Sequence, residues 1–192
     1  MCNMKRAMIV HGWEGYPSEA WFPWLKGELE ARGWEVQVPA MPEAGTPRID
    51  AWVAELARVV GSPDEELLLI GHSIGVQTIL RYIETIDVRI AKVVSVAGFF
   101  TLVPHSIGSA EDEKIAEPWL TRPIDTDRVR RNAGEIVALF SDDDRFVPFE
   151  NIGLFEERLG AKVTVLHARG HMGATDHAEV VPEILEACLG LV

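Results

Sequence analysis

Cysteine, long apolar segments and positive charge are all scarce in this sequence. Its two cysteines among 192 residues, Cys2 and Cys188, lie far apart without metal-ligand spacing, so we expect reduced thiols in a cytoplasmic protein. No segment approaches the roughly 20 apolar residues that span a bilayer, and the apolar run before His11 is too short for a secretory signal. With 18 basic against 30 acidic residues, the net charge is −12. We therefore expect neither nucleic acid nor membrane as a partner.

What the sequence does contain is a regular alternation of strand and helix patterns. A chain of this length is expected to form one domain, residues 1–192, with a large core. Near-continuous apolar runs such as residues 93–97 are typical of strands buried on both faces. They indicate an α/β fold with about six mostly parallel strands and helices on both faces. We expect strands near residues 5–10, 34–38, 66–70, 90–97, 135–140 and 162–167. We expect helices near residues 22–32, 48–60, 74–86, 149–159 and 178–189.

The most informative motif is the pentapeptide Gly71–Gly75, which reads Gly-His-Ser-Ile-Gly between a predicted strand and a predicted helix. A Gly-x-Ser-x-Gly sequence in this context is typical of a nucleophile elbow. The glycines leave room for strand and helix to approach, and the strained turn exposes the Ser73 hydroxyl at the helix N-terminus. The alternative interpretation is a glycine-rich turn with an uninvolved serine.

A serine hydroxyl is a weak nucleophile and needs a base and an orienting acid. The strand predicted at 135–140 leads into three aspartates at 142–144, and the strand predicted at 162–167 leads into a histidine-rich loop. Serine, acid and histidine therefore follow one another in the order known for this kind of elbow, at the strand ends where α/β sheets place their active sites. The alternative for the aspartates, favoured for Asp142, is a solvated turn that caps a helix beginning near Pro148.

Among the histidines, His171 is the preferred base because it lies between glycines in a loop, with room to turn its ring toward Ser73. His167 ends a strand and is expected to be structural, and His177 is expected to open the last helix. These three histidines lack a patterned carboxylate partner, so we predict no metal site. Two further histidines precede the serine and do not fit the order: His11 and His72.

Together these features resemble the α/β-hydrolase superfamily, and within it the small serine hydrolases related to retinoblastoma-binding serine hydrolases and their short bacterial relatives. The resemblance covers nearly the whole chain and rests on His11-Gly12-Trp13, Trp21–Leu25, Met41-Pro42, Gly71–Gly75, Asp143–Pro148 and Gly170-His171. The Trp-Phe-Pro-Trp-Leu run and the doubled aspartate before Val-Pro are more family-specific than the elbow. One departure is Met172, where an aromatic is expected; we expect it to affect pocket shape.

The resemblance implies a fold and a catalytic triad of Ser73, Asp144 and His171. Asp144 is favoured as the acid because Asp-x-x-Val-Pro is similar to the acid loop of the superfamily, and Asp143 is the second choice. In this triad the histidine takes the serine proton, and the aspartate holds the imidazole tautomer and stabilises the imidazolium.

The resemblance also implies an oxyanion hole made of two backbone N–H groups. In α/β-hydrolases a His-Gly-x turn after the first strand supplies one donor, and the residue after the nucleophile supplies the other. By that pattern the donors are the amides of Trp13 and Ile74. Such a mechanism needs no metal and no organic cofactor.

The segment from 98 to 133 interrupts the alternation and is expected to form a short cap, because α/β-hydrolases often carry one here. Its aromatic residues Phe99, Phe100 and Trp119 are candidates for an acyl pocket and equally for ordinary core. The acidic run 111–113 is expected to be a solvated helix start rather than a substrate contact.

The expected function is that of a serine hydrolase acting through an acyl-enzyme, with a carboxylesterase on small esters as the first choice. Two alternatives stay open. One is an amidase or peptidase, or a lyase or perhydrolase, on the same triad. The other is a protein-binding module on a hydrolase fold with little catalysis. The expected partner is a small ester or amide substrate, and no protein partner is predicted.

Overall fold

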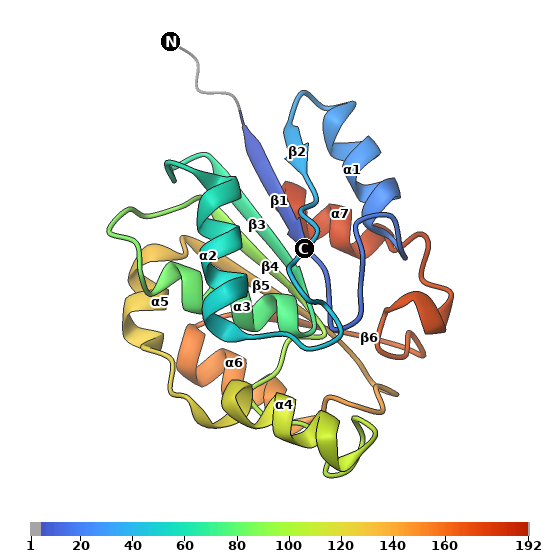
Figure 1. Cartoon of the computed structure of the whole chain (residues 1–192). Coiled ribbons are helices and arrows are strands. Elements are labelled where there is room, and N and C mark those ends of the chain that lie inside the picture. Colours follow the sequence, from blue (N-terminus) through green and yellow to red (C-terminus); the bar gives the residue numbers. More distant parts are fainter. Residues whose placement is uncertain (1–4, 192) are drawn as a thin grey trace.

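A parallel six-stranded sheet forms the centre of the molecule (Figure 1). The computed structural model describes residues 5–191. The strands are β1 (Arg6–Val10), β2 (Glu35–Gln37), β3 (Leu67–His72), β4 (Lys92–Val96), β5 (Glu135–Ser141) and β6 (Lys162–Leu166). They follow the order β2-β1-β3-β4-β5-β6, and every neighbouring pair is parallel. The expected α/β architecture is confirmed, with a sheet that is wholly parallel within the described residues.

Helices cover both faces of this sheet (Figure 1). They are α1 (Phe22–Glu30), α2 (Ile49–Val60), α3 (Ile74–Ile83), α4 (Ala110–Thr121), α5 (Thr126–Asn132), α6 (Glu150–Leu159) and α7 (Pro182–Leu189), with a 3₁₀ turn η1 (Ala174–Asp176). Leu68 and Ile70 of β3 pack in one core with α1 and α7, whereas Leu67 and Leu69 pack in the other with α2, α3 and α6. Because both faces of β3 are buried, its sequence is continuously apolar rather than alternating.

The last helix begins later than the sequence pattern indicated. The expected helix at 178–189 is observed only from Pro182, which occupies the first helical position, where its fixed φ is favourable and its missing N–H is not needed. His177 lies before it, in the left-handed region at φ 55° after η1. The expectation that His177 opens the last helix is therefore wrong.

The connection between β4 and β5 carries α4, which lies beyond the carboxyl ends of the strands, and α5, which packs beside α3 and α6 and returns the chain to the start of β5 (Figure 1). The acidic start of α4 is confirmed, because Ser109 and Asp112 form a capping box there. The fully buried Asn151 side chain anchors the beginning of the connection by accepting the Phe100 and Thr101 amides. A buried arginine of α3 anchors the α4–α5 junction, since Arg81 donates to three backbone carbonyls there, those of residues 119, 122 and 123.

Two buried histidines lie at the carboxyl ends of the central strands. His11 donates from Nδ1 to the Gly12 carbonyl over 2.8 Å and accepts the Met41 amide at Nε2 over 3.0 Å, so it is neutral. His72 donates from Nε2 to the His171 carbonyl over 2.9 Å. Burial lowers the pKa of both rings, and that of His72 falls to about 3 through burial first and the nearby His171 second.

We predict that the neutral His72 makes the folded protein lose stability as pH falls from 7 to 5. Its folded pKa of about 3 lies below the value of 6.5 for an unperturbed histidine, so protons bind preferentially to the unfolded chain below pH 6.5. The loss attributable to this ring is about 2 kcal/mol at pH 5. Urea unfolding at several pH values, with His72→Gln as the comparison, measures it. The glutamine variant should lose less stability, and equal losses would contradict the prediction.

Candidate active site

Ser73 occupies a strained turn between β3 and α3. Its φ of 53° lies in the left-handed region, which is unusual for a residue other than glycine. A Cβ on Gly75 would lie 2.4 Å from the Val10 carbonyl oxygen, and one on Gly71 would lie 2.8 Å from the Val76 nitrogen. Both flanking positions therefore require glycine, and the turn expected from the pentapeptide is present.

His171 and Asp144 form a close pair beside this turn. The His171 Nδ1 and Asp144 Oδ2 atoms lie 2.7 Å apart, and the two side chains are 13% and 3% exposed. The other carboxylate oxygen of Asp144 accepts the amides of Phe146 and Val147 over 2.8 and 3.1 Å. Because both oxygens are engaged, the carboxylate is held in one orientation, and the ring is left with Nε2 as its only free nitrogen.

Asp143, the second choice for the acid, binds elsewhere. It accepts the Ser141 hydroxyl and the Gly170 amide, both over 2.7 Å, and these hydrogen bonds lower its pKa, that from Ser141 most. It therefore anchors the backbone of the loop that carries His171 rather than the imidazole itself. Of the two candidates, only Asp144 contacts the His171 ring.

Asp142 also binds the loop after β6. It accepts the Ala168 amide and pairs with His167, whose side chain is 91% exposed. The Ala168 bond and then the His167 bond lower the pKa of Asp142, and this pairing raises the pKa of His167. The expectation that Asp142 caps the helix near Pro148 is wrong, because α6 begins at Glu150 without a side-chain cap and the carboxylate satisfies the neighbouring loop instead.

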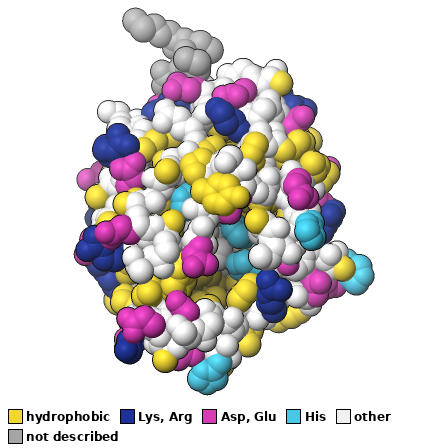
Figure 2. Space-filling model, turned by 45° about the vertical axis from the view of Figure 1, so that its right-hand side comes forward, with side chains coloured by type: hydrophobic (Ala, Val, Ile, Leu, Met, Phe, Trp, Pro, Cys, Tyr) yellow, Lys and Arg dark blue, Asp and Glu magenta, His cyan; other side chains and the backbone are white. Residues whose placement is uncertain are grey.

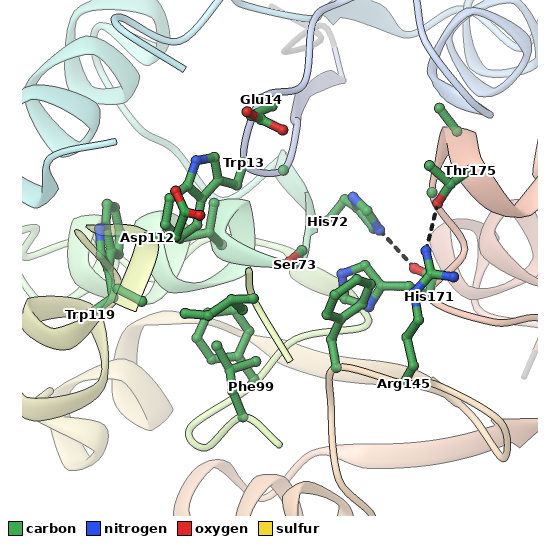
Figure 3. Close-up of a pocket in the computed structure, with 18 of the residues that line it drawn as sticks. Trp13, Glu14, His72, Ser73, Phe99, Asp112, Trp119, Arg145, His171 and Thr175 are labelled. Carbon is green, nitrogen blue, oxygen red and sulfur yellow. Dashed lines mark hydrogen bonds between the residues drawn. The ribbon is translucent and has the colours of Figure 1, made fainter. Parts of the chain in front are cut away.

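Ser73 and His171 line one pocket of about 380 Å³, which also contains Trp13 and Ile74 (Figure 3). Figure 2 shows histidine side chains in a hollow flanked by hydrophobic and acidic side chains. No hydrogen bond joins the Ser73 hydroxyl to His171 within the described residues. A serine side chain can reach other staggered positions, and such catalytic bonds often tighten only when substrate binds.

Two of the three aromatic candidates belong to the pocket wall. Phe99 and Trp119 line it, and Phe100 does not. Phe100 packs instead against Phe155 with ring centroids 5.1 Å apart, and the Arg158 guanidinium lies over its other face. Phe100 is therefore part of the packing between the β4–β5 connection and α6.

Trp13 and Ile74 both line the pocket, and the backbone amide of neither has a hydrogen-bond acceptor among residues 5–191. Ile74 opens α3, where a helix leaves its first N–H groups unpaired. The Trp13 loop is held from outside, because the Trp13 indole donates to the Gly45 carbonyl and the Glu14 amide donates to the Ala44 carbonyl. Two donors are thus available near Ser73 without local rearrangement.

A supporting layer beneath the site was not recognised from the sequence. His72 donates a hydrogen bond to the His171 carbonyl. The rings of Trp21 and Phe22 pack against the His72 ring, with ring centroids 6.3 and 6.2 Å apart. The Trp21 indole also donates to the Met172 carbonyl over 3.1 Å. Met172 is fully buried in the core with α1 and α7 and does not line the pocket, so the expectation that it affects pocket shape is wrong.

Neither a metal cluster nor a membrane segment is found in the part of the chain that the structure describes. His167 and His171 pair with different aspartates, and no three His, Cys, Asp or Glu side chains of residues 5–191 are grouped to hold a metal ion. No helix in the same range combines the length and apolar character needed to cross a bilayer.

Several known proteins are similar to this chain over most of its length. The serine hydrolase RBBP9 of Rattus norvegicus is 27% identical over 184 residues, which are 94% of each chain. YdeN of Bacillus subtilis is 26% identical over 169 residues, 87% of this chain and 85% of YdeN. The solved structure of the ydeN gene product covers 97% of this chain and 98% of its own, with a TM-score of 0.88 at 23% identity. A carboxylesterase structure from Nitrososphaera gargenis shares the fold, with a TM-score of 0.72, 14% identity and coverage of 97% and 89%.

The match to a known family extends over nearly all of the described residues. The model of the serine hydrolase family matches residues 7–188, a range that includes the turn at Ser73 and the loop at His171. The resemblance to small serine hydrolases of the α/β-hydrolase fold is confirmed by this match and by the relatives above. From the first strand to the last helix, this chain belongs to the serine hydrolase family.

Proposed function

We propose that the protein is a carboxylesterase for small esters, with Ser73 as nucleophile, His171 as base and Asp144 as the orienting acid. The observation that carries the proposal is the hydrogen bond between the buried Asp144 carboxylate and the ring of His171, which lines the same pocket as the strained Ser73. This arrangement has the parts that hydroxyl activation requires, namely a nucleophile, a base and a group that orients the base.

In the first half-reaction, Ser73 Oγ attacks the ester carbonyl carbon and its proton passes to His171 Nε2. The carbonyl π electrons move to the oxygen, and the amides of Trp13 and Ile74 donate hydrogen bonds to that oxyanion. In other serine hydrolases the loss of one such donor lowers turnover by about 10²–10³-fold. The bond to the alcohol oxygen then breaks, and this oxygen receives the proton from Nε2, which leaves an acyl-enzyme on Ser73.

The second half-reaction repeats these steps with water. His171 Nε2 takes a proton from water as the water oxygen attacks the acyl carbon, and it returns that proton to Ser73 Oγ as the acyl bond breaks. The carboxylic acid is released and the serine is restored. Asp144 holds the imidazole in one orientation throughout, because one of its oxygens meets the ring while the other accepts the Phe146 and Val147 amides.

We predict that a fluorophosphonate probe labels the wild-type protein and does not label Ser73→Ala. The label forms only on an activated serine, so His171→Ala should react at least about 10³-fold more slowly. Ser18→Ala removes a serine outside the pocket and should label like the wild type. Labelling is measured by in-gel fluorescence of folded protein. Persistent labelling of Ser73→Ala, or none of the folded wild type, would contradict the assignment.

We predict that Asp144→Asn lowers kcat by about 10⁴-fold, because an amide stabilises the wrong imidazole tautomer and cannot balance an imidazolium. Asp143→Asn is the matched control, since an amide oxygen can still accept the Ser141 and Gly170 hydrogen bonds. The kcat of Asp143→Asn should stay within a few-fold of the wild-type value. Steady-state kinetics on an activated short-chain ester measure both, and a larger loss for Asp143→Asn would move the acid role to that residue.

We predict that phenyl butyrate is hydrolysed faster than butyranilide and that both reactions disappear in Ser73→Ala. The same triad serves esterases and amidases, so the ratio of the two rates decides between them. Initial rates are measured by release of phenol and aniline. A higher rate on the anilide would identify an amidase. No Ser73-dependent turnover of either compound would favour a binding module on a hydrolase fold.

A further inference from the structure

The pocket has two chemically different sides, with Ser73 between them (Figure 3). Trp13, Phe99 and Trp119 lie on one side, and His171 and Arg145 lie on the other. The first side is closed further by apolar residues of the β4–β5 connection, namely Leu102, Ile107 and Ala116. The pocket therefore offers a mainly apolar surface, with Asp112 at its wall, to one half of a substrate and a polar surface to the other half.

Arg145 is an exposed residue on the polar side, with contacts to Phe146 and Thr175. Its guanidinium carbon lies 4.8 Å from the centre of the Phe146 ring, and that ring packs edge-on against His171 with centroids 4.9 Å apart. Arg145 Nη2 also donates to the hydroxyl of Thr175 over 3.1 Å. The stack and this hydrogen bond place the cation beside the base of the proposed triad, on the neighbouring loop.

This cation lacks a protein counter-charge. No carboxylate of the described residues forms an ion pair with Arg145, and both oxygens of the adjacent Asp144 are engaged by His171 and backbone amides. Among the described residues that line the pocket, Arg145 is the only arginine or lysine. Apart from the N–H that binds Thr175, the N–H donors of the planar Arg145 guanidinium are available to a ligand. Two of them in parallel match the geometry of a carboxylate.

The direction of proton transfer decides which half of an ester meets this cation. His171 Nδ1 is engaged by Asp144, so only Nε2 can return a proton to the leaving alcohol oxygen. The leaving alcohol must therefore lie on the side of His171, which is also the side of Arg145. The acyl group must lie on the opposite side of Ser73, against the surface that contains Phe99 and Trp119.

Resting on the proposed esterase function, we propose that the site prefers esters of an apolar acid with an alcohol that carries a carboxylate, and that Arg145 recognises this carboxylate.

Three acidic residues also line the pocket: Glu14, Glu19 and Asp112. Glu14 and Glu19 belong to the segment after β1 and Asp112 belongs to α4, and none of the three forms an ion pair with Arg145 among the described residues. The Asp112 carboxylate is already engaged in the cap of α4. Charges outside the pocket are screened within about 10 Å at ordinary salt concentrations. We therefore expect the attraction of a substrate carboxylate to Arg145 to outweigh its repulsion by the net negative charge of the protein.

The test compares two esters of the same size and shape, the butyrates of 4-hydroxybenzoate and 4-hydroxybenzamide, which differ in the charge of the leaving phenol. The wild type should favour the carboxylate ester by about tenfold in kcat/KM, as expected for a charged hydrogen bond at a partly exposed site. Arg145→Gln should reduce this ratio to about one. Arg145→Lys should restore part of it, because the charge returns without the planar fork.

Two further variants separate charge recognition from loop positioning. Arg169→Gln removes an arginine of the same region that pairs with Glu183 and does not line the pocket, and it should keep the wild-type ratio. Thr175→Val removes the hydroxyl that holds Arg145 and leaves the charge, so a ratio above one should remain. A wild-type ratio near one, or a ratio that Arg145→Gln leaves unchanged, would overturn the assignment of Arg145 alone. If neither ester shows Ser73-dependent hydrolysis, the esterase function fails and this assignment fails with it.

Discussion

The hydrogen bond from the His72 ring to the His171 carbonyl is the constraint on which the rest of the site depends. His72 precedes Ser73 in the chain, so one buried imidazole joins the loop of the nucleophile to the loop of the base. The ring packs against the rings of Trp21 and Phe22, and Gly12 lies so close that a Cβ there would be 3.0 Å from its Nδ1 atom. It must also stay neutral, since burial makes its charged form costly. One buried imidazole at the pocket wall therefore links the positions of Ser73 and His171.

The fold and much of the site could be predicted because their signals are local. Apolar runs, helix-ending residues and the pentapeptide around Ser73 each occupy a few consecutive residues, and parallel topology then brings the strand ends to one edge. The role predicted for Asp142 was wrong because a contact with a distant segment decides it, and that for His177 was wrong because α7 begins only at Pro182. Asp142 satisfies an amide 26 residues later in the chain. Nothing in the acidic triplet itself distinguishes the carboxylate that meets the imidazole from the two that hold the loop.

The residues of the proposed triad and the apolar wall of the pocket come from different parts of the fold. Ser73, Asp144 and His171 are carried by the ends of β3, β5 and β6, which the sheet holds in register. The apolar wall comes instead from the β4–β5 connection, which Asn151 and Arg81 fasten near its start and at the α4–α5 junction. Under the proposed function, we expect substitutions between these anchors to reshape the apolar wall without moving the strand ends. This separation suits a family in which one triad serves different substrates.

The strained turn at Ser73 shows how such a site is stabilised. A non-glycine residue in the left-handed region costs about 1–3 kcal/mol, and the surroundings must hold it there. Here the Ser73 amide donates to the Val96 carbonyl over 2.9 Å, and α3 packs with every one of its residues buried. Gly75 brings α3 so close to the end of β1 that a single Cβ would collide with the Val10 carbonyl. Relaxing the serine would therefore require α3 to leave both neighbouring strands, and the hydroxyl stays exposed because the alternative disrupts the core.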